Sequence, residues 1–228
     1  RDNLLAELVG SISQPVDFVD HYRAEGRDYD TGWEERWVRD EGYLKIVPRA
    51  VTALLERTGI AAADIAHFVM PTDQGTVPGT LVKQFGMPGT AVTDNLLQTV
   101  GSTGAAHPLV LLAHRLEQAK PGDLLLLVGF GQGCDALLFR ATARVATWKP
   151  ARGVSGALAA GVAETNYNKF QSFNNLLEKE LGKRSELDKN AFLSAMYRNR
   201  ALANSFIGGK CTSCQTVQIP KAHYCVNP

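Results

Sequence analysis

The stretch that decides the fold runs from Gly101 to Arg144 and reads GSTGAAHPLVLLAHRLEQAKPGDLLLLVGFGQGCDALLFRATAR. Its first part predicts a helix, because apolar residues recur every three or four positions, as one face of a helix requires. Ser102 or Thr103 is expected to cap it. The apolar positions of this helix are Ala105, Leu109, Leu112, Leu116 and Ala119.

Two strands are expected after that helix. A turn at residues 121–123 leads into the wholly apolar run 124–128, which is typical of a strand covered on both faces. A buried helix segment has the same pattern, so periodicity alone leaves that alternative open. The glycine-rich segment 129–133 predicts a loop, and a second strand follows. There, Leu137, Phe139 and Ala141 alternate with Leu138 and Arg140, which favours one covered and one wetter face.

The preceding residues add helices and strands in alternation. Residues 16–49 indicate an ordered, amphipathic surface segment. The next segments predict a helix over 50–57 ending at Gly59, a strand over 67–70, a helical face over 77–85 closing at Gly86, and a brief strand over 91–93. Residues 72–75 form a loop at the carboxyl end of a strand, where open α/β sheets bind ligands. This order favours a mixed, layered α/β fold.

Composition limits the classes of function. The chain has 228 residues, 45% of them hydrophobic, and a formal net charge of +1. A core of useful size is therefore expected, and neither nucleic acid nor a membrane is an expected partner. No apolar run reaches the length of a membrane span, so a cytoplasmic location is expected. The chain begins with Arg and ends soon after a cysteine, which indicates that one or both natural ends are missing.

The amino-acid composition changes after residue 149. Residues 150–166 contain much Gly and Ala and predict a linker. Residues 167–205 have helical spacing, which suits either a two-helix linker or docking arm, or helices that pack on their own domain. The apolar positions of this segment are Phe170, Phe173, Leu177, Leu181, Phe192, Met196 and Leu202.

Three of the four cysteines lie near the end, as Cys211-Thr-Ser-Cys214 and Cys225. A Cys-x-x-Cys knuckle supplies two corners of a tetrahedral zinc site, and the third cysteine strengthens that interpretation. The fourth ligand is either His223 or a residue beyond Pro228. A redox pair and plain reduced cysteines remain alternatives, but no thioredoxin-like pattern surrounds the motif. We expect one structural zinc, bound by Cys211, Cys214 and Cys225.

Several of these motifs resemble a known superfamily. GSTGAAHP, PGDLLLLVGFGQG and VDFVDHYR...WEERWVRDEGY resemble the C-terminal half of thiolase-superfamily condensing enzymes, close to 3-hydroxy-3-methylglutaryl-CoA synthase and ketoacyl-ACP synthase III. The tail, ending GGKCTSCQTVQIPKAHYC, is similar to the start of the zinc-ribbon and OB-fold proteins that accompany such enzymes. The resemblance implies a thiolase-like α/β/α half with a mixed sheet over 1–149, a linker over 150–166, a helical arm over 167–205 and a zinc-ribbon segment over 206–228.

The resemblance also implies site residues, with departures. Thr72 stands where the family has a His, and Ser102 stands where it has an Asn. Asp73 and His107 are the nearest groups that could transfer a proton, although a helix histidine is more often merely packed. The catalytic candidates are therefore Asp73, Ser102 and His107. The nucleophilic cysteine belongs to a missing N-terminal half, and Cys134 is expected to be a small buried residue.

Substrate binding is expected at the glycine loop. Backbone N–H groups around Gly131, Gln132 and Gly133, together with Thr72, would bind an acyl-CoA thioester and stabilise its oxyanion. The first hypothesis is an enzyme, or a subunit of one, that makes or breaks a carbon–carbon bond in an acyl-CoA. The second is a noncatalytic thiolase-like partner that binds acyl-CoA and stabilises a complex. The resemblance also implies a homodimer or hetero-oligomer that includes the missing N-terminal half or a partner subunit.

Overall fold

The structure is a computed structural model that describes residues 3–177 and 193–227. The chain divides into two compact units, Arg1–Ala163 and Glu164–Pro228, which we call the sheet unit and the tail unit. Each is described by itself. None of the described helices is long and apolar enough to cross a membrane.

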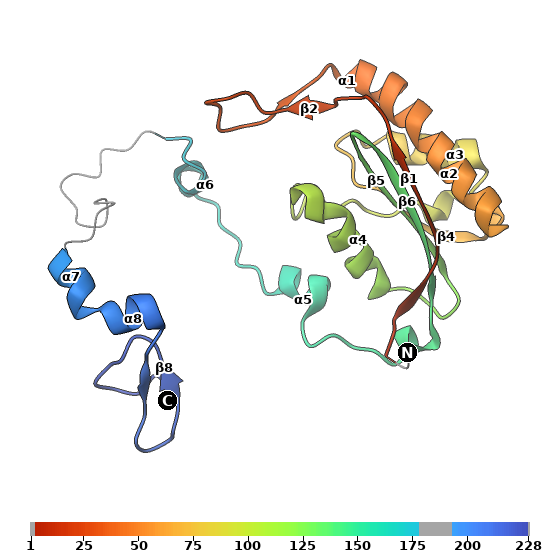
Figure 1. Cartoon of the computed structure of the whole chain (residues 1–228). Helices are drawn as coiled ribbons and strands as arrows, with labels where there is room; N and C mark the ends of the chain where they lie inside the picture. Colours follow the sequence, from red (N-terminus) through yellow and green to blue (C-terminus); the bar gives the residue numbers. More distant parts are fainter. Residues whose placement is uncertain (1–2, 178–192, 228) are drawn as a thin grey trace. The chain divides into compact units, whose positions relative to one another are not determined.

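A mixed four-stranded sheet forms the centre of the sheet unit (Figure 1). Its strands, in spatial order, are β1 (Ala6–Pro15), β6 (Gly133–Ala141), β5 (Leu124–Gly131) and β4 (Ile65–Val69). β4 and β5 are parallel, whereas β6 runs antiparallel to both β5 and β1. The mixed α/β architecture expected from the sequence is therefore confirmed.

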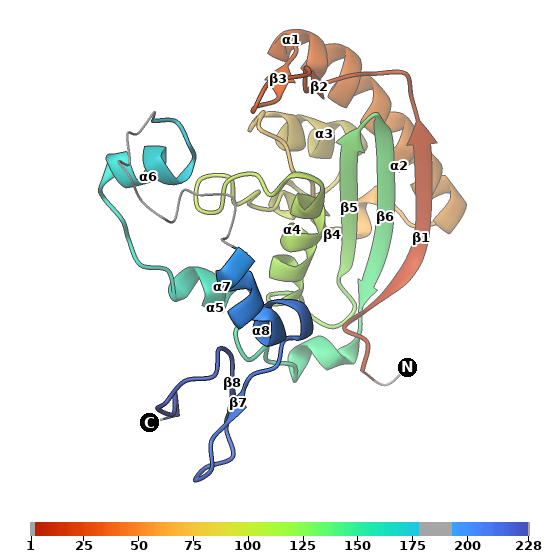
Figure 2. The same cartoon turned by 60° about the vertical axis from the view of Figure 1, so that its left-hand side comes forward.

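Helices cover both faces of this sheet. α2 (Leu44–Thr58) and α3 (Val77–Phe85) pack on one face, and each ends at a glycine, Gly59 or Gly86, in the left-handed conformation. α4 (His107–Leu116) and α5 (Gly153–Ala159) lie on the other face, as Figure 2 shows for α4 and α2. The result is three layers, with one apolar core on either side of the sheet.

The two cores differ in size. The larger lies between the sheet and α2 and α3, and its fully buried members include Phe68, Leu126, Leu138, Val51 and Leu81. The core under α4 is smaller and contains Val69, Leu111 and Leu127. Because β4, β5 and β6 contribute side chains to both cores, the sheet is buried on its two faces.

Short elements connect these layers. A two-stranded hairpin, β2 (His21–Tyr22) with β3 (Thr31–Gly32), precedes α1 (Glu35–Trp37) and a π-helical segment η1 (Val38–Tyr43) that continues into α2. The 3-10 turns are η2 (Ala62–Asp64), η3 (Gly89–Ala91), η4 (Gly104–Ala106) and η5 (Ala143–Ala146). The segment 16–49 is thus ordered, as expected.

α4 starts later than predicted, and its expected apolar face is confirmed only in part. It begins at His107 with Ala106 as N-cap, and no side chain caps it. Leu109 is 63% exposed, whereas Leu111 is buried. Leu112, Leu116 and Ala119 pack against the core, as expected.

The second strand and the glycine loop also differ from expectation. In β6, Leu138 is fully buried, so the face expected to be wetter is covered by α2. Residues 129–131 belong to β5, and the chain reverses at Gln132 in a tight hairpin instead of a long loop. Residues 91–93 form only an isolated bridge from Val92 to Phe68. The linker 150–166 contains α5, and β1 was not expected.

The tail unit contains small elements. They are α6 (Tyr167–Phe173), α7 (Leu193–Arg198), α8 (Arg200–Ser205), β7 (Gly209–Lys210) and β8 (Val217–Gln218). Helical structure is confirmed for these parts of the expected arm, while Leu181 and Phe192 lie outside the described residues. Phe170 and Phe173 are 52% and 80% exposed. None of the unit's described residues is buried.

Candidate functional site

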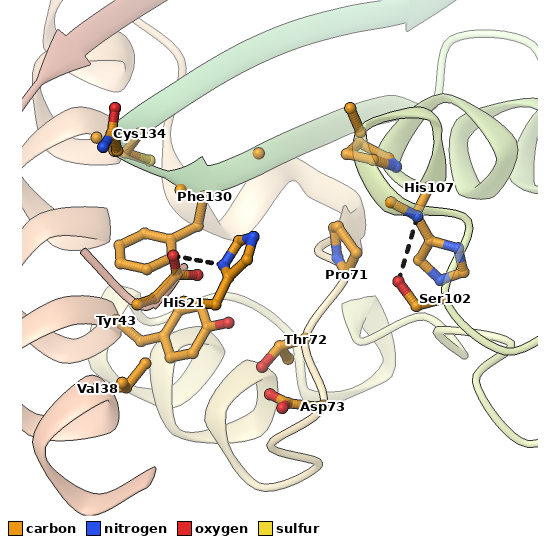
Figure 3. Close-up of a pocket in the computed structure, with 18 of the residues that line it drawn as sticks. His21, Val38, Tyr43, Pro71, Thr72, Asp73, Ser102, His107, Phe130 and Cys134 are labelled. Carbon is orange, nitrogen blue, oxygen red and sulfur yellow. Dashed lines mark hydrogen bonds and ion pairs between the residues drawn. The ribbon is translucent and has the colours of Figure 1, made fainter. Parts of the chain in front are cut away.

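A cavity of about 800 Å³ lies within the sheet unit, near the carboxyl end of β4 and the turn between β5 and β6 (Figure 3). Segments that are far apart in sequence line it together: residues 71–74, 102–108 and 129–135. Every expected catalytic or substrate-binding residue is among them: Thr72, Asp73, Ser102, His107, Gly131, Gln132 and Gly133. The structure thus brings these seven residues to one site, where their contacts differ.

The two glycines of the hairpin turn have opposite environments. Gly133 has φ +125°, and a Cβ there would collide with the backbone of Gln14 and Pro15 on β1. Gly131 has no heavy atom within 4 Å of where its Cβ would be. Gly133 is therefore needed for the fold, whereas the missing side chain at Gly131 leaves space beside the backbone for a ligand.

Thr72 is buried and already has hydrogen-bond partners. Its hydroxyl accepts a bond from the Gln74 N–H at 3.1 Å, and its carbonyl accepts one from Asn95 Nδ2 at 2.9 Å. Asp73, the next residue, is exposed. Thr72 therefore shapes the loop after β4, and Asp73 is the side chain of that loop that can meet a ligand.

His107 is also buried, and both of its ring nitrogens are engaged. Nε2 donates to the Asn95 carbonyl at 2.9 Å, so Nδ1 of the neutral ring accepts the Thr103 N–H at 3.3 Å. His107 therefore links the first turn of α4 to the backbone at Asn95. Its contacts give it a positioning role and do not leave a nitrogen free for proton transfer. Ser102 is exposed, and its Oγ accepts the Gly104 N–H.

Cys134 is the cysteine beside the turn, and it is 3% exposed. Burial, and then the neighbouring Asp135 carboxylate, raise the pKa of its thiol to about 12. A thiol with such a pKa is protonated at neutral pH and is a poor nucleophile. The expectation that Cys134 is a small buried residue is confirmed.

Sequence reasoning missed two parts of the cavity wall. Tyr43 is buried with its ring 4.4 Å from that of Phe130, and burial raises the pKa of its phenol to about 12 although a hydrogen bond with Thr72 acts against that rise. His21 and Asp20 form a pair, with His21 Nδ1 2.7 Å from Asp20 Oδ1. The sequence shows Asp20 and His21 side by side, which suggests that they form a pair. It does not show that the hairpin β2–β3 brings this pair to the cavity.

The cavity is acidic. Its described lining includes the carboxylates of Asp20, Asp30, Glu35, Asp73 and Asp135, and neither a lysine nor an arginine. Such a lining disfavours anionic groups, so the phosphates of a nucleotide-like ligand would lie outside this part of the site. An uncharged portion of a ligand suits the interior.

The cysteine cluster lies in the tail unit. The sulfur atoms of Cys211, Cys214 and Cys225 are all within 4.8 Å of one another, next to the two-stranded hairpin β7–β8. Hydrogen bonding with Thr216 lowers the pKa of Cys214 to about 6, which favours the thiolate that binds metals. Zn–S bonds of about 2.3 Å in a tetrahedron match sulfurs this close. The residues could hold a metal ion, and His223 is not part of this cluster.

Comparisons with known proteins find one matching family model and several curated relatives. Residues 55–140 match the family model of the 3-oxoacyl-[acyl-carrier-protein] synthase III C terminal. A hydroxymethylglutaryl-CoA synthase of Pyrobaculum aerophilum is 32% identical over 140 residues, which are 61% of this chain and 40% of that protein. A hydroxymethylglutaryl-CoA synthase of Methanopyrus kandleri is 29% identical over 148 residues, 64% of this chain and 42% of that protein.

Solved structures agree with this fold. The 3-oxoacyl-[acyl-carrier-protein] synthase III from Aquifex aeolicus is similar with a TM-score of 0.52 and 18% identity, over 61% of this chain and 46% of that one. The corresponding synthase III from Pseudomonas aeruginosa gives 0.50 and 21%, over 59% of this chain and 44% of that one. The chain spans about two fifths of the length of the curated relatives it matches. The family match over residues 55–140, the relatives and the fold all support similarity to thiolase-superfamily condensing enzymes.

Proposed function

We propose that the chain supplies the C-terminal half of a site that makes or breaks a carbon–carbon bond in an acyl-CoA. The observation that carries this is the cavity, in which the loop after β4, the start of α4 and the β5–β6 turn meet. The names of the relatives, hydroxymethylglutaryl-CoA synthases, point to a CoA thioester as the substrate. The acidic lining suits the acyl and pantetheine end of that thioester, with the phosphates kept outside.

In this proposal, the C-terminal half positions the thioester and stabilises the oxyanion that forms on it. Main-chain N–H groups at Gly131, Gln132 and Gly133 stabilise the oxyanion that develops when the thioester carbonyl is attacked. The open side of Gly131 lets the thioester approach that backbone. Asp73 is exposed to the ligand, while Thr72 and His107 hold their loops in place through the bonds described above. The nucleophilic cysteine comes from an N-terminal half or partner subunit, because Cys134 is buried.

A second candidate function is a noncatalytic subunit that binds acyl-CoA and stabilises a complex. It is favoured by Thr72 and Ser102, which stand where the superfamily has its His and Asn, and by the two engaged nitrogens of His107. The two candidates differ in the N-terminal half. A cysteine at its nucleophile position supports the enzyme, and its absence supports the noncatalytic partner.

The test uses the chain together with its N-terminal half or partner subunit. Incubation with radiolabelled acetyl-CoA should give a covalent acyl-protein, located by mass spectrometry on a cysteine outside this chain. The chain alone should bind acetyl-CoA weakly and should not become acylated. Binding by the complex without acylation would favour the noncatalytic candidate. Failure of the complex to bind acyl-CoA at all would reject both.

We also propose the arrangement of the rest of the protein. Residues 1–149 form the thiolase-like half, 150–166 a linker whose helix α5 packs on the sheet unit, 167–205 the arm and 206–228 the start of a zinc-ribbon and OB-fold domain in which zinc is structural. The thiolase-like part pairs as a homodimer or hetero-oligomer, since closed twofold assemblies are the commonest among soluble oligomers. Sedimentation of the complete protein at micromolar concentration should show an assembly larger than the monomer, and a monomer alone would contradict this.

A further inference from the structure

Two imidazoles line the described part of the cavity, and their situations are opposite. His107 is buried with both nitrogens bonded to the backbone. The side chain of His21 is 57% exposed and is bonded through Nδ1. His107 therefore has a structural role, because it hydrogen-bonds the backbone through both nitrogens, whereas the exposed imidazole of His21 can contact a ligand.

The bond between His21 and Asp20 sets the tautomer of that free imidazole. Nδ1 lies 2.7 Å from Asp20 Oδ1, and an ionised carboxylate can only accept, so Nδ1 carries the proton. Nε2 is then left with its lone pair. None of the described residues makes a hydrogen bond to Nε2. A carboxylate that orients an imidazole in this way leaves the opposite nitrogen ready to accept a proton.

The hairpin β2–β3 holds this pair at the cavity. The side chain of Asp20 is only 16% exposed, and its carbonyl accepts the Trp33 N–H at 3.0 Å, which ties the two arms of the hairpin together. The ring of Trp33 lies 5.7 Å from that of Tyr22. Figure 3 shows the imidazole of His21 in the middle of the view, between Phe130 and Pro71 and above Tyr43 and Thr72. Asp20 and His21 both line the cavity.

From this geometry we infer that His21 is a catalytic proton-transfer residue of the acyl-CoA site and that Asp20 is its positioning residue. The inference rests on the proposed function. Nε2 takes a proton from the carbon next to the thioester carbonyl: the C–H bond breaks, an N–H bond forms, and the electron pair moves into the enolate. The enolate oxygen is stabilised by the main chain near Gly131. In the reverse direction the imidazolium returns the proton.

His21 suits this role better than the other exposed candidate, Asp73. Among side-chain types, imidazole titrates closest to neutral pH, and a general base works best when its pKa is near the working pH. The bond from Nδ1–H to Asp20 does not involve Nε2, so the ring stays oriented while Nε2 takes and returns the proton. This would also restore an imidazole to a site in which Thr72 occupies the family's histidine position.

The experiment follows proton exchange instead of the complete reaction. The protein, with its N-terminal half or partner subunit, is incubated with acetyl-CoA in D₂O, and deuterium in the acetyl methyl group is measured by mass spectrometry. His21→Ala should slow exchange by about 100-fold, as expected for removal of a general base. Added imidazole should restore part of the rate in His21→Ala. Asp20→Asn keeps an acceptor for Nδ1–H but removes its charge, so it should slow exchange less than His21→Ala.

Arg23→Gln is the matched control on the same hairpin. It removes the exposed ion pair with Asp30, lies outside the described cavity lining, and should leave exchange unchanged. An equal loss in Arg23→Gln, or a loss in His21→Ala that imidazole does not rescue, would overturn the assignment by showing a purely structural effect. Normal exchange in His21→Ala would overturn it while leaving the proposed function intact. Wild-type protein that binds acetyl-CoA without any exchange would also overturn it, and wild-type protein that does not bind acetyl-CoA would reject both.

Discussion

The sheet unit and the tail unit are held together by different means. In the sheet unit, the strands and helices bury side chains on both sides of the sheet, and Phe68, Leu126 and Leu138 are fully buried. In the tail unit, none of the described residues is buried, and the three cysteines form its main cluster. The hydrophobic effect is therefore the main stabilising contribution in the first unit, whereas we expect a metal ion at the cysteines to stabilise the second.

The largest expected effect is removal of the metal from the tail. If zinc binds Cys211, Cys214 and Cys225, its binding free energy is also the folding free energy of the hairpin, on the order of 10 kcal/mol. Cys214→Ser, or a strong chelator, should unfold residues 206–228 and leave the sheet unit unchanged. Metal analysis and amide hydrogen exchange measure the two units separately. Less than a tenth of a zinc per chain under reducing conditions, in protein extending past Pro228, would contradict the zinc proposal.

A substitution in the larger core should destabilise the sheet unit and leave the tail unit unchanged. Phe68 on β4 is 0% exposed and packs in the larger core, so Phe68→Ala should lower the free energy of unfolding by about 3–5 kcal/mol. Denaturant titration of the sheet unit checks this. The zinc content of the tail should not change. Loss of metal from the tail in Phe68→Ala would show that the two units are energetically coupled and do not fold independently.

Within the sheet unit, the two hairpin glycines separate folding from binding. Gly131→Val places its side chain in open space, so stability should stay within about 0.5 kcal/mol of the wild type. Turnover of acyl-CoA should fall by the equivalent of about 2–4 kcal/mol if the oxyanion donors are displaced.

Gly133→Val is the matched comparison for this pair. Its positive φ and the collision with β1 should cost about 3 kcal/mol of stability. Thermal melts and steady-state kinetics on both variants decide between folding and binding roles. Normal turnover in Gly131→Val would place the site elsewhere.

The smallest expected effect concerns the attachment of α5. Glu117, at the end of α4, accepts the N–H groups of Val154 and Ser155. Burial alone would raise the pKa of Glu117, but the bonds from Ser155 and Val154 lower it below its ordinary value. A carboxyl whose pKa is lower in the folded state stabilises above its unfolded pKa and loses that contribution as pH falls through the folded value.

Glu117→Gln should therefore lower the unfolding free energy by about 1–2 kcal/mol near pH 7, and the difference should shrink progressively below about pH 4. Equilibrium unfolding measured across this pH range is the check. Glu56→Gln on the exposed side of α2 serves as the control. A difference from the wild type that is the same at pH 3 and pH 7 would show that Glu117 does not act through its charge.

Local signals explain which parts could be predicted. The ends of α2 and α3 were predictable because Gly59 and Gly86 adopt a left-handed conformation that other residues avoid. The cysteine cluster was predictable because a Cys-x-x-Cys turn brings two sulfurs together by local geometry. The approach of the loops at 72–75 and 129–133 followed from their positions at strand ends, together with the family resemblance.

Non-local packing explains the failures. β1 carries a bulge between Leu8 and Gly10 and leaves Leu8 55% exposed, so its sequence lacks a clean alternation. The role of His107 depends on the carbonyl of Asn95, which no helical periodicity reveals. The position of His21 depends on how the hairpin β2–β3 folds over the cavity. These features are decided by contacts between distant segments, which residue spacing does not encode.

The pairing of β1 with β6 has a consequence for how the protein is made. Thr142 donates to the carbonyl of Leu4, 138 residues away, and β6 bonds β1 along its length. β1 therefore leaves the ribosome long before its partner strand exists, and its backbone groups stay unpaired during that time. Closing so long a loop slows folding, and an unpaired strand is prone to wrong pairing. Chaperone dependence during synthesis is thus expected to lie in β1, at the opposite end of the chain from the cysteine cluster.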